Sequence, residues 1–378
     1  DGKATAPADN VQNAQWTRTL TLDKVTGKVL NPTEPWAANK ANYDAVPTPS
    51  LTGYYADKAS VASKTVTEEN LEETVTYRPL GNLVPKPEKP NDPNFPSTPE
   101  VKYPNDPTDP TKPGKPVVPD VPGYKPYLPD PNDPSQPGKP VEPGKPITPE
   151  NPGEDTPIIY RKADQKATIK YVDQNTGTTL ENDQVGGKSG EAIDYSTAAK
   201  IKYYEDRGYV LVSDEFPAGA TYDTDASVDQ TWTVTLKHGE TPVGPNDPHN
   251  PTDPINPNDP NSPKYPAKDQ WTKDVTSTVH YVVSDGKATA PADNVQNAQW
   301  TRTLNLDKVT GKVLNPDAPW TANKANYDAV PTPGLTGYYA DKGSVASKTV
   351  TQENLEETVT YKPLGNLVPK PEKPNDPN

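Results

Sequence analysis

The stretch Ala167-Thr-Ile-Lys-Tyr-Val-Asp173 decides the fold of the central part of the chain. Its apolar and polar side chains alternate, which is the period of a strand with one buried face. The turn sequence Gln174-Asn-Thr-Gly177 follows directly, and a second short strand comes after it. Two strands joined by such a turn predict a β-hairpin.

A helix is expected after the hairpin. Ser196 is a good N-cap, residues 197–207 contain no Pro or Gly, and Gly208 is a natural helix stop. Ala198 and Ile201 fall on one face of this helix, which we expect to be the buried face. Two more strands follow, the first apolar throughout and the second alternating: Tyr209-Val-Leu-Val212, expected to be buried, and Thr231-Trp-Thr-Val-Thr-Leu236, with Trp232, Val234 and Leu236 inward.

The order strand, strand, helix, strand, strand over residues 160–238 predicts a β-grasp fold, in which one helix covers one face of a mixed sheet. A second kind of module, described next, is richer in strands. We therefore expect an α+β, β-rich chain of small modules. The strands expected in the second kind of module are 275–283, 300–306, 312–314 and 357–361.

A long internal repeat organises the chain, because residues 1–94 and 285–378 differ at only eight positions. Near-identity over such a length predicts a tandem array, which is typical of multivalent binders and stalks rather than of enzymes. The differing pairs are Thr21/Asn305, Thr33/Asp317, Glu34/Ala318, Ala37/Thr321, Ser50/Gly334, Ala59/Gly343, Glu68/Gln352 and Arg78/Lys362.

A strand directly precedes the second copy. In Trp271-Thr-Lys-Asp-Val-Thr-Ser-Thr-Val-His-Tyr-Val-Val283, four apolar residues fall on one face at period two, namely Val275, Val279, Tyr281 and Val283. The first copy begins just after the point where this strand would lie. We therefore expect residues 1–80 to form a module with an open sheet edge and to be the less ordered of the two copies.

Proline recurs at every third position over residues 104–122, 131–152 and 242–266. Polyproline II has three residues per turn, so this period predicts extended spacers, although P-x-x-P is also the spacing of ligands for aromatic grooves. The expected segments are a module lacking its first strand at 1–80, a linker at 81–159, the β-grasp module at 160–238, a linker at 239–266, a complete second-type module at 267–364 and the start of a linker at 365–378.

The composition narrows the classes of fold and function that are possible for this chain. Only 30% of the 378 residues are hydrophobic, 50 are Pro and none is Cys or Met, so several small cores must form without disulfides. A net charge of -14 repels nucleic-acid phosphates and anionic membranes. No apolar stretch approaches the roughly 20 residues of a membrane helix, and we expect an internal fragment because the chain opens without a signal peptide.

Motifs for catalysis and zinc binding are weak. His238, His249 and His280 lie far apart in the sequence, and one is in a proline segment, so neither a zinc cluster nor a His-dependent triad is expected. Gly187-Lys188-Ser189 resembles the end of a phosphate-binding loop, but Asn182 stands where that loop requires its first Gly. A turn is the better interpretation of this segment.

Acidic residues give no specific site either. Asp223 and Asp225 could offer oxygen ligands to Ca²⁺, but the twelve-residue spacing of a calcium loop is missing, which favours a solvated loop. A carboxylate pair for glycoside hydrolysis depends on three-dimensional distance, and nothing in the sequence favours one. We expect no enzyme activity, no metal and no cofactor.

Tyrosine is the candidate binding residue, with 20 Tyr against two Phe. Its flat apolar face and polar tip suit both half-buried sheet positions and stacking on sugars or peptides. Because adjacent strand residues point to opposite faces, one of each tyrosine pair is expected to be exposed, although both could instead cover a core edge. The candidates are Tyr203, Tyr204, Tyr338, Tyr339 and Trp320, the last with its first-copy counterpart Trp36 in a loop where capping of the sheet is the alternative.

The order of these segments resembles a known family. Ile-Lys-Tyr-Val-Asp-Gln-Asn-Thr-Gly, Gly-Lys-Ser-Gly-Glu, Arg-Gly-Tyr-Val-Leu and Thr-Trp-Thr-Val within residues 167–236 resemble the mucin-binding-protein (MucBP) domain of lactobacillar surface adhesins. The repeated module is similar to the second domain type of these proteins through Val-His-Tyr-Val-Val, Trp-Thr-Arg-Thr-Leu, Asp-Lys-Val-Thr-Gly-Lys-Val, Gly-Tyr-Tyr-Ala-Asp-Lys and Thr-Val-Thr-Tyr. The resemblance covers about two thirds of the chain, by the extent of the two module types.

The resemblance implies tandem ubiquitin-like β-grasp folds in a monomeric, elongated chain outside a Gram-positive cell, anchored to the wall through parts beyond this fragment. It also implies adhesion to mucin glycoproteins or their glycans by many weak contacts, and some related repeats bind immunoglobulins as well. A stalk that presents another binding domain is the alternative. An exposed aromatic patch or groove on a module would favour adhesion, whereas featureless charged faces would favour the stalk.

Overall fold

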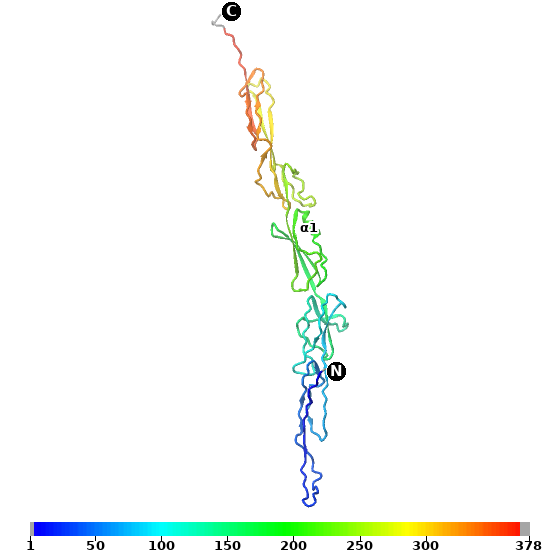
Figure 1. The fold of residues 1–378 in the computed structure, drawn as a ribbon. Coiled ribbons are helices and arrows are strands. Elements are labelled where there is room, and N and C mark those ends of the chain that lie inside the picture. The colour runs from blue at the N-terminus through cyan, green and yellow to red at the C-terminus, as the bar shows by residue number, and fades with distance from the viewer. Residues whose placement is uncertain (1–3, 371–378) are drawn as a thin grey trace. The chain divides into compact units, whose positions relative to one another are not determined.

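The computed structural model describes residues 4–370. Strands dominate it, and Figure 1 labels the single α-helix of this part of the chain, α1. Packing of the chain gives two compact units: Asp1–Thr168 with Gln184–Asp194 and Ala218–Thr231, and Ile169–Asp183 with Tyr195–Pro217 and Trp232–Asn378. Among the described residues, no helix is long and apolar enough to cross a membrane. The model is β-rich, as expected.

In the first copy of the repeat, the described strands pair only two at a time, in the antiparallel pairs β1-β2, β3-β7, β4-β6 and β5-β8. Each pair is two or three residues long, so little apolar surface is covered. The strands are β1 (Trp16–Thr17), β2 (Ala37–Ala38), β3 (Asn42–Tyr43), β4 (Val46–Pro47), β5 (Tyr54–Ala56), β6 (Ser60–Val61), β7 (Lys64–Thr65) and β8 (Tyr77–Pro79).

The proline-rich residues that follow form a five-stranded sheet in the order β10-β9-β13-β11-β12, with β9 and β13 parallel. The extended linker expected at 81–159 is not confirmed, because the apolar residues between the prolines pack together. Leu83, Tyr103, Val118, Tyr124 and Ile158 are in its buried core. The strands are β9 (Asn82–Pro87), β10 (Val101–Lys102), β11 (Tyr124–Pro129), β12 (Pro137–Pro140) and β13 (Thr156–Lys162).

The central sheet has the order β15-β14-β17-β16. Its hairpin is confirmed as β14 (Asp164–Asp173) and β15 (Thr179–Lys188), and Val234 and Leu236 of β17 (Gln230–His238) are buried, with Trp232 only partly so. The expectation of a buried strand after the helix is wrong. β16 (Tyr209–Asp214) lies at the sheet edge, where Val210, Leu211 and Val212 are exposed.

The helix α1 (Ala198–Glu205) is confirmed in extent, but its cap and its buried face differ from those expected. Thr197 rather than Ser196 occupies the N-cap position, and its hydroxyl donates to Asp214 Oδ2 at 2.5 Å. Ala198 is exposed, whereas Tyr204 is the buried residue of the helix. The buried face of the helix is therefore the one that carries Tyr204, and not the one that carries Ala198.

The second proline segment also packs against a neighbouring strand. β18 (Glu240–Val243) pairs antiparallel with β21 (Leu304–Asp307), and Val243, Ile255, Tyr265 and Trp271 form a buried core with Leu304 and Leu306. A single-turn helix, η1 (Lys268–Gln270), precedes Trp271. The linker expected at 239–266 is thus not confirmed either.

The second copy completes a five-stranded sheet in the order β22-β20-β19-β28-β25. The expected strand at 275–283 is confirmed as β19 (Thr272–Val283), which is antiparallel to β20 and parallel to β28. Residues 312–314 form only a bridge at Val313 rather than a strand. The other strands are β20 (Asn294–Thr301), β22 (Thr321–Ala322), β23 (Asn326–Tyr327), β24 (Val330–Pro331), β25 (Tyr338–Ala340), β26 (Ser344–Val345), β27 (Lys348–Thr349) and β28 (Leu355–Pro363).

Two leucines of each copy show how much the segment that precedes the second copy contributes to the core of that copy. Leu304 and Leu306 are fully buried, whereas their counterparts Leu20 and Leu22 are 39% and 55% exposed. The residues that cover Leu304 and Leu306 lie mostly before residue 285, outside the repeated stretch. Near-identical sequence therefore has different energetics in the two copies.

We predict that Leu306→Ala destabilises its module by about 2–5 kcal/mol, because it leaves a cavity in a filled core. Leu22→Ala is the matched control, and it should change local stability by no more than about 0.5 kcal/mol. Hydrogen exchange of peptides from each module measures the two effects separately within one chain. Equal losses of protection in both variants would contradict the difference in burial.

Candidate functional site

The tyrosine pair of α1 divides into a core residue and a surface residue. Tyr204 is buried, its hydroxyl donates to Glu181 Oε2 at 3.2 Å, and its ring packs 5.8 Å from Tyr171. Burial, followed by the Glu181 carboxylate, raises the pKa of Tyr204. Tyr203 is exposed, and the Arg207 guanidinium lies 3.5 Å from its ring centroid. Only Tyr203 therefore has a face near solvent, and an arginine already occupies part of it.

The tyrosine pair of β25 is arranged in a similar way. Tyr338 is half-buried and its hydroxyl donates to Asp285 Oδ1 at 3.1 Å, whereas Tyr339 is exposed. Burial and the hydrogen bond to Asp285 raise the pKa of Tyr338. No described contact joins these tyrosines to Trp320, so the structure does not bring the candidate residues into one site.

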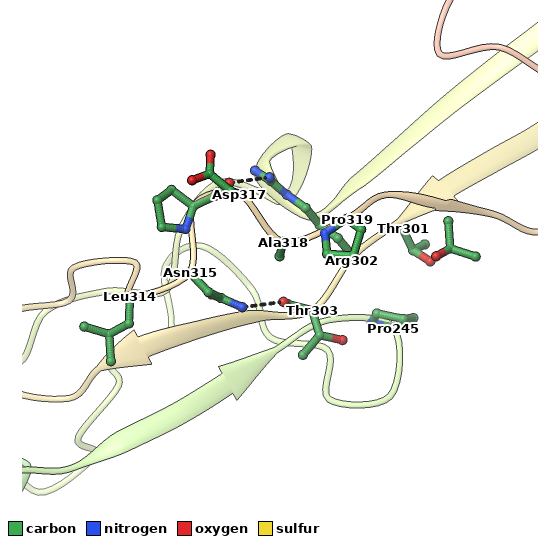
Figure 2. Close-up of a pocket in the computed structure, with 11 residues that line it drawn as sticks. Pro245, Thr301, Arg302, Thr303, Leu314, Asn315, Asp317, Ala318 and Pro319 are labelled. Atoms are coloured by element: carbon green, nitrogen blue, oxygen red, sulfur yellow. Dashed lines mark hydrogen bonds between the residues drawn. The ribbon is translucent and has the colours of Figure 1, made fainter.

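A groove of about 740 Å³ in the second copy (Figure 2) is lined by Pro319 and Thr321, the two sequence neighbours of Trp320. Arg302 connects the two features, because its guanidinium lies 4.6 Å from the Trp320 ring and Arg302 also lines the groove. Its Nη1 donates to the Pro316 carbonyl at 2.8 Å and its Nε to the Gln270 carbonyl at 2.7 Å. Cation–π contact and two hydrogen bonds thus hold the arginine in one orientation.

Asn315 fixes the opposite side of this groove. Its Oδ1 accepts a hydrogen bond from the Asn305 backbone at 2.6 Å. Its Nδ2 donates to the Thr303 carbonyl at 3.1 Å, as Figure 2 shows. The loop that follows β21 is therefore tied to the strand beside it. The groove offers hydroxyl, amide and carboxylate groups from the following lining residues: Thr301, Thr303, Asn315, Asp317 and Thr321.

The first copy builds the same scaffold. Arg18 lies 4.6 Å from the Trp36 ring, and its Nη1 donates to the Pro32 carbonyl at 3.3 Å. Asn31 accepts from the Thr21 backbone at 2.8 Å and donates to the Thr19 carbonyl at 2.9 Å. The arrangement therefore forms even where Leu20 and Leu22 are exposed.

The differences between the copies gather at this groove. Three of the eight fall on its lining residues, namely Thr33/Asp317, Glu34/Ala318 and Ala37/Thr321. Trp320 stands out in the sequence by its residue type, whereas Arg302 and Asn315 do not, because they act through hydrogen bonds to backbone carbonyls. The clustering of differences around Trp320 was the signal that could have found the groove.

The chemistry available at the groove is that of binding. Hydroxyls, an amide, a carboxylate and an oriented guanidinium are suited to hydrogen bonds with a polar ligand. Within the described residues, no group of three or more His, Asp or Glu side chains is placed to hold a metal ion. Asp225 instead accepts hydrogen bonds from Ser227, as in a solvated turn.

We predict that Tyr204→Ala destabilises the central module by about 3–5 kcal/mol, as large buried aromatic truncations do. Tyr203→Ala is its neighbour on the exposed face and should cost no more than about 0.5 kcal/mol. Chemical denaturation followed by hydrogen exchange in the central module distinguishes the two. A loss from Tyr203→Ala as large as that from Tyr204→Ala would show that both are core residues.

Comparison with known families assigns most of the chain. The model of a mucin binding domain matches residues 165–238, and the model of a Muc B2-like domain matches residues 1–81 and 266–365. A comparison with curated proteins gives no significant match. The family matches leave residues 82–164 and 239–265 outside both domain types.

Several solved structures are similar to this chain. Mub-RV is 33% identical to it over 53% of this chain and 100% of its own, with a TM-score of 0.39. The type 2 repeat of the mucus binding protein MUB from Lactobacillus reuteri is 35% identical over 53% of this chain and 99% of its own, with a TM-score of 0.36. The MucBP domain of an adhesion protein from Pediococcus pentosaceus is 31% identical over 24% of this chain and 97% of its own, with a TM-score of 0.21.

Proposed function

This chain belongs to the family of mucin-binding repeats found in mucus-binding adhesins, and we propose that it binds mucin glycoproteins through many weak contacts spread over its modules. Linking several weak sites raises the effective concentration of each, so a tight single site is unnecessary. The protein is then an extracellular surface adhesin, attached to the cell wall of a Gram-positive bacterium.

The observation that carries the proposal is the arrangement of arginine, tryptophan and asparagine that both copies build and that lies at the groove of the second copy. In each copy an arginine lies over the tryptophan and an asparagine ties the loop to its neighbouring strand. Rigid polar groups beside an aromatic ring suit a sugar, which presents hydroxyls at its rim and C–H groups on its faces. A featureless spacer would have no need of this arrangement twice.

Charge decides which glycans the groove favours. The chain carries a net charge of -14, which repels sulfated or sialylated chains at long range. At the second groove, Arg302 supplies a local positive group, whereas Asp317 adds a negative one. We therefore propose that neutral glycan segments are the main ligands. The two copies should differ in preference, because the first copy has Thr33 in place of Asp317 and Glu34 in place of Ala318.

The finer architecture belongs to the same proposal. One helix beside a four-stranded sheet at residues 164–238 supports a β-grasp module. A monomeric chain and a role for immunoglobulins as further ligands remain proposals that rest on the family resemblance. The alternative of a stalk is retained because long arrays of repeats also serve to hold other domains away from a surface.

We predict that Trp36→Ala together with Trp320→Ala lowers binding of the full chain to immobilised mucin by on the order of tenfold or more, and that each single variant has a smaller effect. Val282→Ala, which removes another exposed apolar side chain, is the control. Surface plasmon resonance with intact and deglycosylated mucin measures the change. Circular dichroism confirms that the variants fold.

The triple exchange Asp317→Thr, Ala318→Glu and Thr321→Ala gives the groove the residues that the first copy carries at the equivalent positions. The same scaffold tolerates these residues in the first copy. It should alter the relative binding of neutral and acidic mucin glycans while leaving stability unchanged. Saturable binding that persists after glycan removal would contradict glycans as the ligands. No binding by a multimerised chain would contradict adhesion and favour the stalk.

A further inference from the structure

His238, at the end of β17, lies between two aspartates from different parts of the fold. Its Nδ1 is 2.6 Å from Asp307 Oδ2, and its Nε2 is 3.0 Å from Asp173 Oδ2. Only 9% of the His238 side chain is exposed, and the two carboxylates are equally well covered. We call these three residues the His238 bridge. It joins the end of β14 to the end of β21 within one compact unit.

Both aspartates begin the same kind of turn, Asp-x-x-Thr-Gly. In Asp173-Gln-Asn-Thr-Gly177, Asp173 Oδ1 accepts from the Asn175 backbone at 2.8 Å and the Gly177 backbone returns to the Asp173 carbonyl at 2.8 Å. In Asp307-Lys-Val-Thr-Gly311, Asp307 Oδ1 accepts from the Val309 and Thr310 backbones in the same way. The Asp307 turn uses only Oδ1 and leaves Oδ2 facing His238. Asp173 Oδ2 faces His238 and also accepts from the Thr176 hydroxyl at 2.8 Å.

The chain around the bridge is closely packed. Lys308 donates its backbone N–H to the Gly239 carbonyl at 2.8 Å, and Gly239 donates to the Gly208 carbonyl at 2.8 Å. A Cβ at Gly208, which has a φ of +91°, would lie 2.7 Å from the Lys308 side chain. Glycine is therefore required for this approach, and the contact of the Asp307 turn with Gly208 and Gly239 is built into the backbone.

The bridge requires a particular protonation state. Only the imidazolium can donate from both ring nitrogens, whereas neutral imidazole leaves one nitrogen as an acceptor facing a carboxylate. With a neutral ring, only one of the two carboxylate oxygens that face it receives a ring N–H, and the other faces a nitrogen lone pair at a buried position, which is unfavourable. We propose that the His238 bridge is a pH-sensitive joint between the mucin-binding module and the following repeat, rigid when the ring is protonated and loose when it is neutral.

The surrounding charges support this assignment. Burial alone would lower the pKa of His238, but hydrogen bonds and charge attraction from Asp307 and Asp173 outweigh it, and the pKa is raised. For both aspartates burial acts to raise the pKa, but their hydrogen bonds prevail and lower it. The other ionisable groups facing the bridge are Tyr209 of β16, whose ring lies 5.3 Å from His238, Lys308 beside Gly239, and Glu240 of β18, which pairs in register with Asp307.

The sign of the pH dependence follows from these directions. A raised histidine pKa contributes stability that is complete below the ordinary value of about 6.5 and is lost as pH rises through the raised value. The lowered aspartate pKa values contribute stability that is complete above about 3.9 and is lost as pH falls further. The joint is therefore most rigid between about pH 4 and 6.5, on the acid side of neutrality.

The chain contains no Cys, so two spin labels can be placed uniquely at exposed positions on either side of the joint, through Glu205→Cys and Ala346→Cys in the full chain. Pulsed electron spin resonance then gives the distribution of distances at pH 5, 7 and 9. We expect a narrow distribution at pH 5 that is at least twofold broader at pH 9. His238→Gln should give the broad distribution at every pH.

His280→Gln is the matched control, since His280 pairs with Asp293 at an exposed site inside one module. It should leave the wild-type pattern unchanged. If His238→Gln fails to fold, NMR titration of the wild-type His238 ring tests the proposal without any variant. We expect a titration midpoint above pH 6.5. A midpoint at or below 6.5, or a distance distribution that does not change with pH, would overturn the proposal.

Discussion

The high proline content imposes the constraint on which this structure depends. Each of the 50 prolines lacks a backbone N–H, so proline-rich segments carry more carbonyl acceptors than donors. Tyrosine hydroxyls fill part of this deficit, because a buried Tyr supplies apolar surface and one donor together. Three of them donate to carbonyls of prolines: Tyr77 to Pro49, Tyr160 to Pro119 and Tyr361 to Pro333. This explains why the cores use tyrosine rather than phenylalanine.

Regular alternation made some of the fold predictable. The strands β14, β17 and β19 carry their apolar residues at every second position, and the sequence located all three. The prediction that the proline segments are extended linkers was not confirmed, for a physical reason. A period of three describes the prolines but not the isolated apolar residues between them, and residues such as Val118 and Val243 become buried only when distant chain segments meet.

The sites show the same limit. Trp320 stood out by its residue type, whereas Arg302 and Asn315 act through backbone carbonyls and carry no local pattern. The three histidines lie far apart in the sequence, which argues against a zinc site, and nothing local marks the partners of His238, which lie 65 and 69 residues away. The turns that begin at Asp173 and Asp307 share one sequence pattern, but their meeting at one imidazole depends on tertiary packing. The exposure of β16 likewise follows from its place at the edge of the sheet. The strand propensity of its residues does not determine that place.

The parallel pairing of β19 and β28 has a mechanical consequence. The chain enters the second copy through β19 and leaves it through β28, and the two strands are aligned in register from Ser277–Leu355 to Val283–Tyr361. A pull applied to both ends of the chain therefore loads all the hydrogen bonds between them in shear, instead of opening them one after another. A surface protein held in flowing mucus experiences such a pull, and this strand pair is the element of the repeat that resists it.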